Sequence, residues 1–60
     1  MNIPSDAYML LSIINTNLRD YFDSLDTFCE SNDVDKKGIE EKLYSIGYVY
    51  VKEENQFKQR

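Results

Sequence analysis

The apolar residues between positions 10 and 22 recur at the spacing of an α-helix, and this repeat constrains the fold more than any other feature. At 100° per residue, one arc of about 120° collects Leu10, Leu11, Ile14, Leu18, Tyr21 and Phe22. Ser5 or Asp6, following Pro4, can cap the first free N–H groups of such a helix. The sequence therefore predicts a first helix over residues 6–21 with a broad buried face.

Three further apolar residues of this helix lie outside that arc. Met9 and Ile13 are one turn apart on its flank, and Tyr8 lies further round. They widen the apolar surface beyond what two short helices can cover, which indicates a protein interface. Asn15 and Arg19 share a helix face, and Arg19 can fork onto a carboxylate from the second helix or from a second chain. The candidate interface is therefore Tyr8, Met9, Ile13, Asn15 and Arg19.

The stretch SLDTFCESNDVDKKGIEEKL, from Ser24 to Leu43, predicts two short helices separated by a turn. Ser24 can cap a helix over about residues 25–31, in which Leu25, Phe28 and Cys29 recur at helical spacing. Asn32 and Asp33 tolerate left-handed or turn conformations. Asp35 can cap a third helix over about residues 36–46, with Ile39, Leu43 and Ile46 on one side.

The last part of the chain is typical of a β-hairpin. Gly47 suits the end of the third helix, and the β-branched and aromatic run YVYV follows it. KEEN then predicts a turn and QFK a returning strand, so the hairpin is expected over about residues 48–58. Phe57 should join whichever alternate pair of YVYV faces the helices.

These elements predict a single domain over residues 1–60, mainly α within the α+β class: a three-helix, helix-turn-helix-like bundle with a short C-terminal β-hairpin. Their order is that of a minimal winged helix. The spacing agrees only in part with a helix-turn-helix, because Asp33 stands where glycine is usual and Asn32 where an apolar residue is usual.

The charge pattern disfavours binding to nucleic acid. Residues 1–35 carry seven acidic side chains and one arginine (−6), and residues 36–60 carry six basic and four acidic ones (+2), which gives −4. A nucleic-acid interface would use the basic residues Lys36, Lys37, Lys42, Lys52 and Lys58. Glutamates at positions 40, 41, 53 and 54 interleave with them and repel phosphates.

Catalytic and metal chemistry also lack their usual residues. Cys29 is the only cysteine and histidine is absent, so an intramolecular disulfide is impossible and a zinc site lacks its usual ligands. Cys29 on an apolar helix face predicts a buried, inert thiol, and neither grouped carboxylates nor a glycine-rich phosphate loop occurs. We expect no enzyme activity, no cofactor and no bound metal.

The start of the chain resembles neither a signal peptide nor a membrane span. It lacks a basic segment, and Ser12 and Asn15 interrupt its apolar run. We therefore expect a cytoplasmic protein. A chain of this size buries only about 60% of its unfolded surface, so homodimerisation would supply missing burial. The leading hypothesis is a non-enzymatic protein–protein interaction module that self-associates or binds another protein. The alternative is a winged-helix-like nucleic-acid-binding accessory or transcriptional regulator.

The segment IPSDAYMLLSIINTNLRDYFDSL, with Cys29, EEKL, IGYVY and NQF further on, resembles a small bacterial family known as domain of unknown function 4250. The resemblance covers nearly the whole chain. It implies a free-standing bacterial protein and brings no activity or functional residue with it. The chain departs from the family pattern at Gly38, where an acidic residue or another good helix former is expected.

Overall fold

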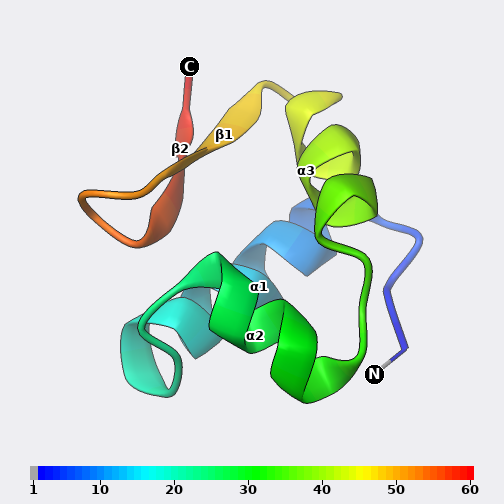
Figure 1. Cartoon of the computed structure of the whole chain (residues 1–60). Helices are drawn as coiled ribbons and strands as arrows, with labels where there is room; N and C mark the ends of the chain where they lie inside the picture. Colours follow the sequence, from blue (N-terminus) through cyan, green and yellow to red (C-terminus); the bar gives the residue numbers. More distant parts are fainter. Residues whose placement is uncertain (1) are drawn as a thin grey trace.

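Three helices followed by an antiparallel β-hairpin make up the protein, in the order that the sequence predicts (Figure 1). The structure is a computed structural model that describes residues 2–60. The elements are α1 (Ala7–Asp20), α2 (Leu25–Asn32), α3 (Lys36–Tyr44), β1 (Tyr48–Val51) and β2 (Gln56–Gln59).

Each helix begins after a polar side chain that accepts hydrogen bonds from its first turn. The Asp6 carboxylate accepts from the N–H groups of Tyr8 at 2.9 Å and Met9 at 3.3 Å. The Ser24 hydroxyl accepts from Thr27 N–H at 3.0 Å, and the Asp35 carboxylate accepts from Gly38 N–H at 3.2 Å. Because each cap satisfies an N–H group that lacks an intrahelical partner, each stabilises the fold by about 1 kcal/mol.

α1 and α3 end earlier than the sequence predicts, whereas α2 extends one residue beyond the expected position 31. α3 ends at Tyr44, two residues before the expected position 46, because Gly47 N–H bonds the Tyr44 carbonyl in a four-residue turn. Gly47 then adopts φ +85°, a conformation that glycine adopts without strain, and leads into β1. At the end of α2, Asp33 adopts the left-handed conformation (φ 53°), as expected for this turn.

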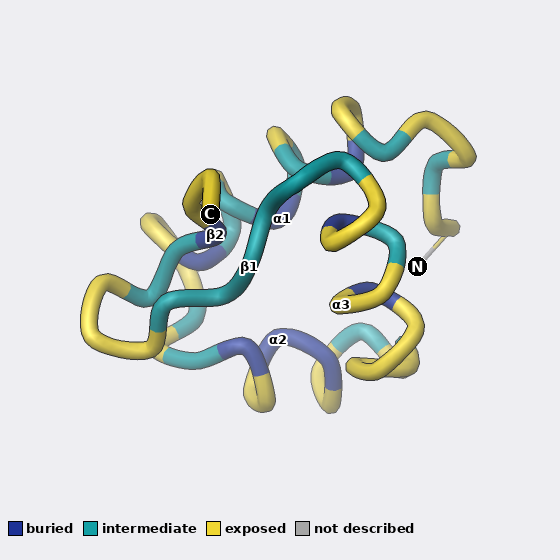
Figure 2. Tube along the Cα trace, turned by 90° about the horizontal axis from the view of Figure 1, so that it is seen from above, coloured by how far each residue is buried: buried dark blue, intermediate teal, exposed yellow. Residues whose placement is uncertain are grey.

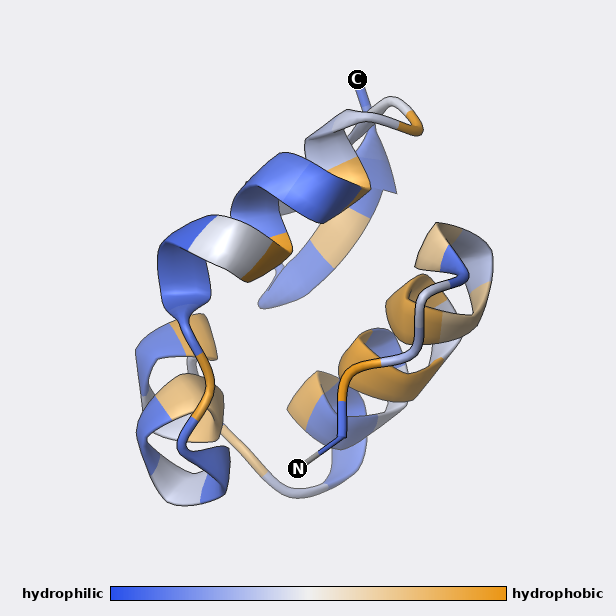
Figure 3. Cartoon of the chain, turned by 90° about the vertical axis from the view of Figure 1, so that its right-hand side faces the viewer, coloured by the Kyte–Doolittle hydropathy of each residue, from blue (hydrophilic) through white to orange (hydrophobic). Residues whose placement is uncertain are grey.

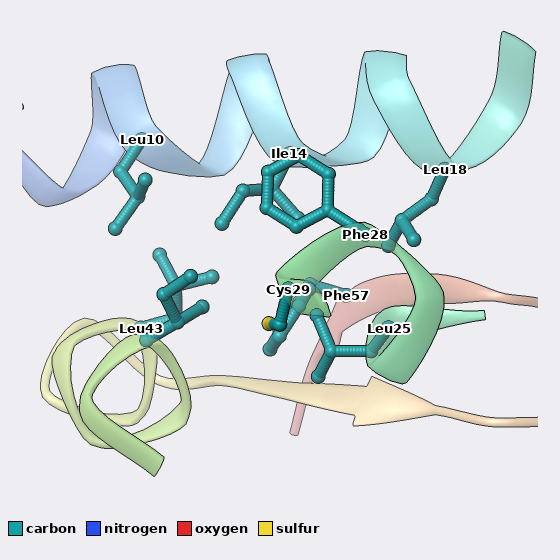
Figure 4. Packing of buried hydrophobic residues seen from close by; sticks show 9 residues of the cluster. Leu10, Ile14, Leu18, Leu25, Phe28, Cys29, Leu43 and Phe57 are labelled. Atoms are coloured by element: carbon teal, nitrogen blue, oxygen red, sulfur yellow. The ribbon is translucent and has the colours of Figure 1, made fainter. Parts of the chain in front are cut away.

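The core lies between the three helices and the inner face of the hairpin (Figure 2). Among the described residues it consists of Leu10, Ile14, Leu18, Leu25, Phe28, Cys29, Ile39, Leu43 and Phe57. Figure 4 shows Leu10, Ile14 and Leu18 pointing from α1 into this cluster. The apolar repeat thus predicts the buried face of α1, with one exception. Tyr21 is 75% exposed, because α1 ends at Asp20 and Tyr21 leaves the helical path at φ −129°.

The hairpin places its aromatic residues on the inner face. Tyr50 lies opposite Phe57 in the strand register, and their ring centroids are 5.5 Å apart. Tyr48 also packs against the core, so the inner pair of YVYV is Tyr48 and Tyr50. Phe57 joins this pair and is 2% exposed. The four residues between the strands form the expected turn.

Gly38 offers a test of the first turn of α3. A Cβ at this position would lie 3.2 Å from Asp35 Oδ2, the end of a flexible side chain that can shift by a few tenths of an ångström. Because alanine is favoured over glycine by up to about 1 kcal/mol within a helix, we expect Gly38→Ala to stabilise the protein by about 0.5 kcal/mol in urea unfolding. Gly47→Ala, at φ +85°, should destabilise it. A loss of stability in Gly38→Ala would show that the Asp35 cap cannot adjust.

Candidate functional site

The side chains of α1 that point away from the core form an exposed surface, which we call the outer face of α1. Its members are Tyr8, Met9, Ser12, Thr16 and Arg19, all of which are exposed, and the half-buried Ile13 lies at its border. Tyr8 is 63% and Met9 56% exposed. Figure 3 shows that α1 is the most hydrophobic helix, whereas α3 is mostly hydrophilic. Four of the five predicted interface residues therefore lie on this face or at its border.

The fifth predicted interface residue, Asn15, faces the hairpin instead. Its Nδ2 donates to the Phe57 carbonyl at 3.1 Å, and its Oδ1 accepts from Phe57 N–H at 2.7 Å. The strand register explains this pairing. Arg60 N–H bonds the Gly47 carbonyl, and in an antiparallel ladder only every second pair of opposite residues is hydrogen-bonded. The Tyr50–Phe57 pair is one of those that are not, so the backbone N–H and carbonyl of Phe57 point away from β1. The Asn15 amide thus takes the place of a neighbouring strand and holds β2 against α1.

Arg19 forms an ion pair within its own helix. Its Nε and one terminal nitrogen donate to the two carboxylate oxygens of Asp20, both at 2.9 Å. The hydrogen bond from Arg19 lowers the pKa of the Asp20 carboxyl. Both side chains are exposed, so this is a surface ion pair, formed with the next residue of the same helix and not with a carboxylate of α2. The pair leaves the guanidinium at the C-terminal end of the outer face.

A second polar cluster, centred on Asn55, was not anticipated from the sequence. Asn55 Nδ2 donates to the carbonyls of Leu18 at 3.0 Å and Phe22 at 2.9 Å. Its Oδ1 accepts from the Tyr50 hydroxyl at 2.6 Å, and that hydroxyl accepts from Leu25 N–H at 3.2 Å. The side chain therefore joins the end of α1, the start of α2 and the hairpin turn. These contacts give Asn55 a structural role.

Three of the five lysines of the alternative nucleic-acid interface lie beside acidic side chains. Lys36 pairs with Asp26 at 2.8 Å, and the hydrogen bond from Lys36 to Asp26 raises the Lys36 pKa. Lys58 pairs with Glu54 at 3.2 Å on the hairpin. Lys37 lies beside Glu40 and Glu41 along a shallow depression on α3. Each of these three lysines thus has an acidic side chain beside it, which weakens the attraction to phosphates.

A cleft of about 210 Å³ lies where the starts of α2 and α3 meet the end of β1. It is lined by Ser24, Leu25, Asp26, Lys36, Tyr50 and Lys52. Its polar groups are largely engaged, since Lys36 pairs with Asp26 and the Tyr50 hydroxyl bonds Asn55. Within residues 2–60, no cluster of three or more acidic or cysteine side chains is placed to hold a metal ion. The helices described for this same range are too short or too polar to cross a membrane.

Cys29 is buried in the core at 5% exposure, as the sequence predicts. Burial raises the pKa of its thiol, and the nearby Asp26 carboxylate raises it further. The thiol therefore stays protonated at pH 8, and a thiol reagent reaches it only when the fold opens. We expect Ellman's reagent to react with Cys29 about 100-fold or more slowly in the folded chain than in urea. A Ser31→Cys variant, with an added thiol on the exposed side of α2, should give one fast and one slow reaction. Fast reaction of Cys29 itself would contradict a closed core.

Three helices closed by a hairpin define a small α+β protein that is mostly helical. The sequence model of the family described as domain of unknown function (DUF4250) matches residues 4–57, and the chain belongs to this family. The matched span contains all three helices and both the Asn15 and Asn55 clusters. Neither the curated proteins nor the solved structures contain a match to the chain.

Proposed function

We propose that this protein is a non-enzymatic protein–protein interaction module whose contact surface is the outer face of α1. The observation that carries the proposal is the exposure of Tyr8 and Met9 at 63% and 56% on the helix that also provides Leu10, Ile14 and Leu18 to the core. Full burial of one large apolar side chain contributes about 1.5–3 kcal/mol, so covering this face favours association. The rigid helix holds both side chains in place before the partner arrives, which lowers the entropic cost of binding.

The other exposed aromatic residues are less suited to docking. The Tyr44 ring is covered on one side by the guanidinium of Arg60, 4.5 Å from the ring centroid. Tyr21 lies beyond the end of α1 and projects from a non-helical residue. Tyr8 and Met9, in contrast, are neighbouring exposed side chains on one helix, so the outer face of α1 is better suited to docking.

A photo-crosslinking experiment tests the proposal. Benzoylphenylalanine replaces Tyr8 in one variant and Tyr21 in a matched control, both in cells of the organism that encodes the chain. We expect a covalent protein adduct from position 8 and little from position 21, although Tyr21 is the more exposed residue. Equal crosslinking from both positions, or none from position 8, would refute the outer face as a contact surface.

Nucleic-acid binding remains the alternative function, and the observation that favours it is the order of three helices and a hairpin. The distribution of charge weighs against it, because Lys36 and Lys58 are already paired with carboxylates. Fluorescence anisotropy with a mixed-sequence DNA duplex at about 50 mM salt tests it where electrostatic attraction is least screened. Binding that weakens steeply with added salt would support this alternative, and no binding would exclude it for the isolated chain.

We also infer a cytoplasmic location. The supporting observation is that Cys29 is a free, buried thiol, and unpaired cysteines are typical of a reducing compartment. Fractionation of cells that carry the tagged chain tests this inference. Recovery in the membrane or the secreted fraction would contradict it.

A further inference from the structure

We infer that the partner on the outer face of α1 is a second copy of this chain, packed antiparallel to the first, with the two-fold axis near Ser12. The inference rests on the proposed function, because it names the occupant of the same surface. Three properties of the outer face carry it: the distribution of large and small side chains, the charges at its two ends, and the direction of the helix dipole.

The outer face is bulky at its start and shallow further along. Tyr8, Ser12 and Thr16 are spaced by four residues and form one row along the helix. Tyr8, together with Met9 beside it, projects at the N-terminal end, whereas Ser12 and Thr16 leave a shallow strip. An antiparallel pair centred on Ser12 places Tyr8 of each copy over Thr16 of the other. A parallel pair would place Tyr8 against Tyr8 and leave the two shallow strips facing each other.

The charges at the two ends of the face also favour the antiparallel arrangement. The exposed Asp6 carboxylate lies at the start of α1 and Arg19 near its end. In the antiparallel pair, Arg19 of each copy, with its ion-pair partner Asp20, approaches Asp6 of the other, whereas a parallel pair would bring the two Asp6 carboxylates together. Antiparallel helix dipoles add to the preference. Asp6 and Arg19 are 13 residues apart in the sequence. This spacing corresponds to about 20 Å along the helix, so they cannot contact within one chain.

The size of the face sets the expected strength of this dimer. α1 has 14 residues, which corresponds to a length of about 21 Å. One face of such a helix buries less than the roughly 800 Å² per partner of a standard interface. The dimer should therefore be reversible, with a dissociation constant of about 10–100 μM.

Analytical ultracentrifugation of the full chain tests whether the partner is a second copy. Concentrations from about 10 μM to 1 mM bracket the expected dissociation constant. The expected result is a mass that rises with concentration from one to two copies of the 7.1-kDa chain. Tyr8→Glu should weaken the dimer about 10-fold or more because it places a charge in the apolar contact. The matched control Tyr21→Glu should leave the dimer unchanged, and circular dichroism should show both variants folded.

A double-mutant cycle tests the antiparallel direction. Arg19→Glu should weaken the dimer about 10-fold, because the introduced carboxylate of each copy then faces the Asp6 carboxylate of the other. Asp6→Ser keeps a helix-capping side chain, and in the Arg19→Glu background it should recover most of the affinity. Coupling between these two positions can arise only across two chains. Independent effects of the two substitutions would overturn the antiparallel register.

The outcomes separate this inference from the proposed function. A strict monomer at about 1 mM, far above the expected dissociation constant, overturns the inference. A crosslinked adduct from position 8 that is heavier than two copies of the chain also overturns it, although the outer face then remains a contact surface for another protein. A position-8 adduct of two identical chains, with the predicted coupling, supports both proposals.

Discussion

Replacing Phe28 by alanine should leave the protein mostly unfolded at 25 °C. Phe28 is fully buried, and its ring meets the Phe22 ring edge to face at a centroid distance of 5.6 Å. A buried Phe→Ala substitution costs about 3–5 kcal/mol, because apolar burial is lost and a cavity remains. The single core of a chain this small rarely supplies more than about 3–5 kcal/mol of stability, so most or all of it is removed.

Urea unfolding followed by circular dichroism measures the effect. Phe28→Leu, which retains most of the buried volume, should lose less stability and keep a cooperative transition. Tyr21→Ala is the surface control and should change stability by less than about 0.5 kcal/mol. If Phe28→Ala unfolds with nearly the midpoint of the original chain, Phe28 does not hold the three helices together.

The second large effect should come from Asn55→Gly. Glycine tolerates the left-handed conformation of Asn55 (φ 53°), so this substitution removes the side-chain hydrogen bonds without adding backbone strain. It leaves the Tyr50 hydroxyl without its acceptor and the carbonyls of Leu18 and Phe22 without their donor. Each half-buried group that loses its partner costs about 1–3 kcal/mol, so the loss of three partners should cost at least about 3 kcal/mol in urea unfolding.

Asp33→Gly is the matched control for this prediction. Asp33 has the same φ of 53°, is exposed, and lies in the turn that follows the C-terminal end of α2. Its replacement should change stability by less than about 1 kcal/mol, because only the backbone preference changes. Similar effects at both positions would show that conformation, and not the hydrogen-bond cluster, makes Asn55 important.

The elements that could be predicted from the sequence are those governed by near neighbours. Asp6, Ser24 and Asp35 cap helices through N–H groups two or three residues away. The turn at Asp33 and the four-residue turn before Gln56 likewise depend on short polar residues that tolerate unusual backbone angles. The repeat of Leu10, Ile14 and Leu18 identifies the buried face of α1, because helical geometry relates spacing directly to direction.

Predictions failed where the chain leaves regular geometry. The arc that includes Tyr21 assumes an ideal helix to position 21, but α1 ends one residue earlier and the ring points to solvent. The sequence predicts that the third helix reaches position 46, but the turn that ends at Gly47 replaces its last two residues. Both misses lie at helix ends, where hydrogen bonding switches from the helix to the following turn.

The sequence by itself determined the helices, their caps, the hairpin and the apolar surplus on α1, because these depend on spacing and on contacts within a few residues. Only the tertiary structure decided which polar residues are structural. Asn15 and Arg19 are one turn apart on α1, yet Asn15 binds Phe57 while Arg19 remains at the surface. The difference arises because β2, 42 residues further along the chain, lies against one side of α1 and not the other. Local spacing carries no information about that distant packing.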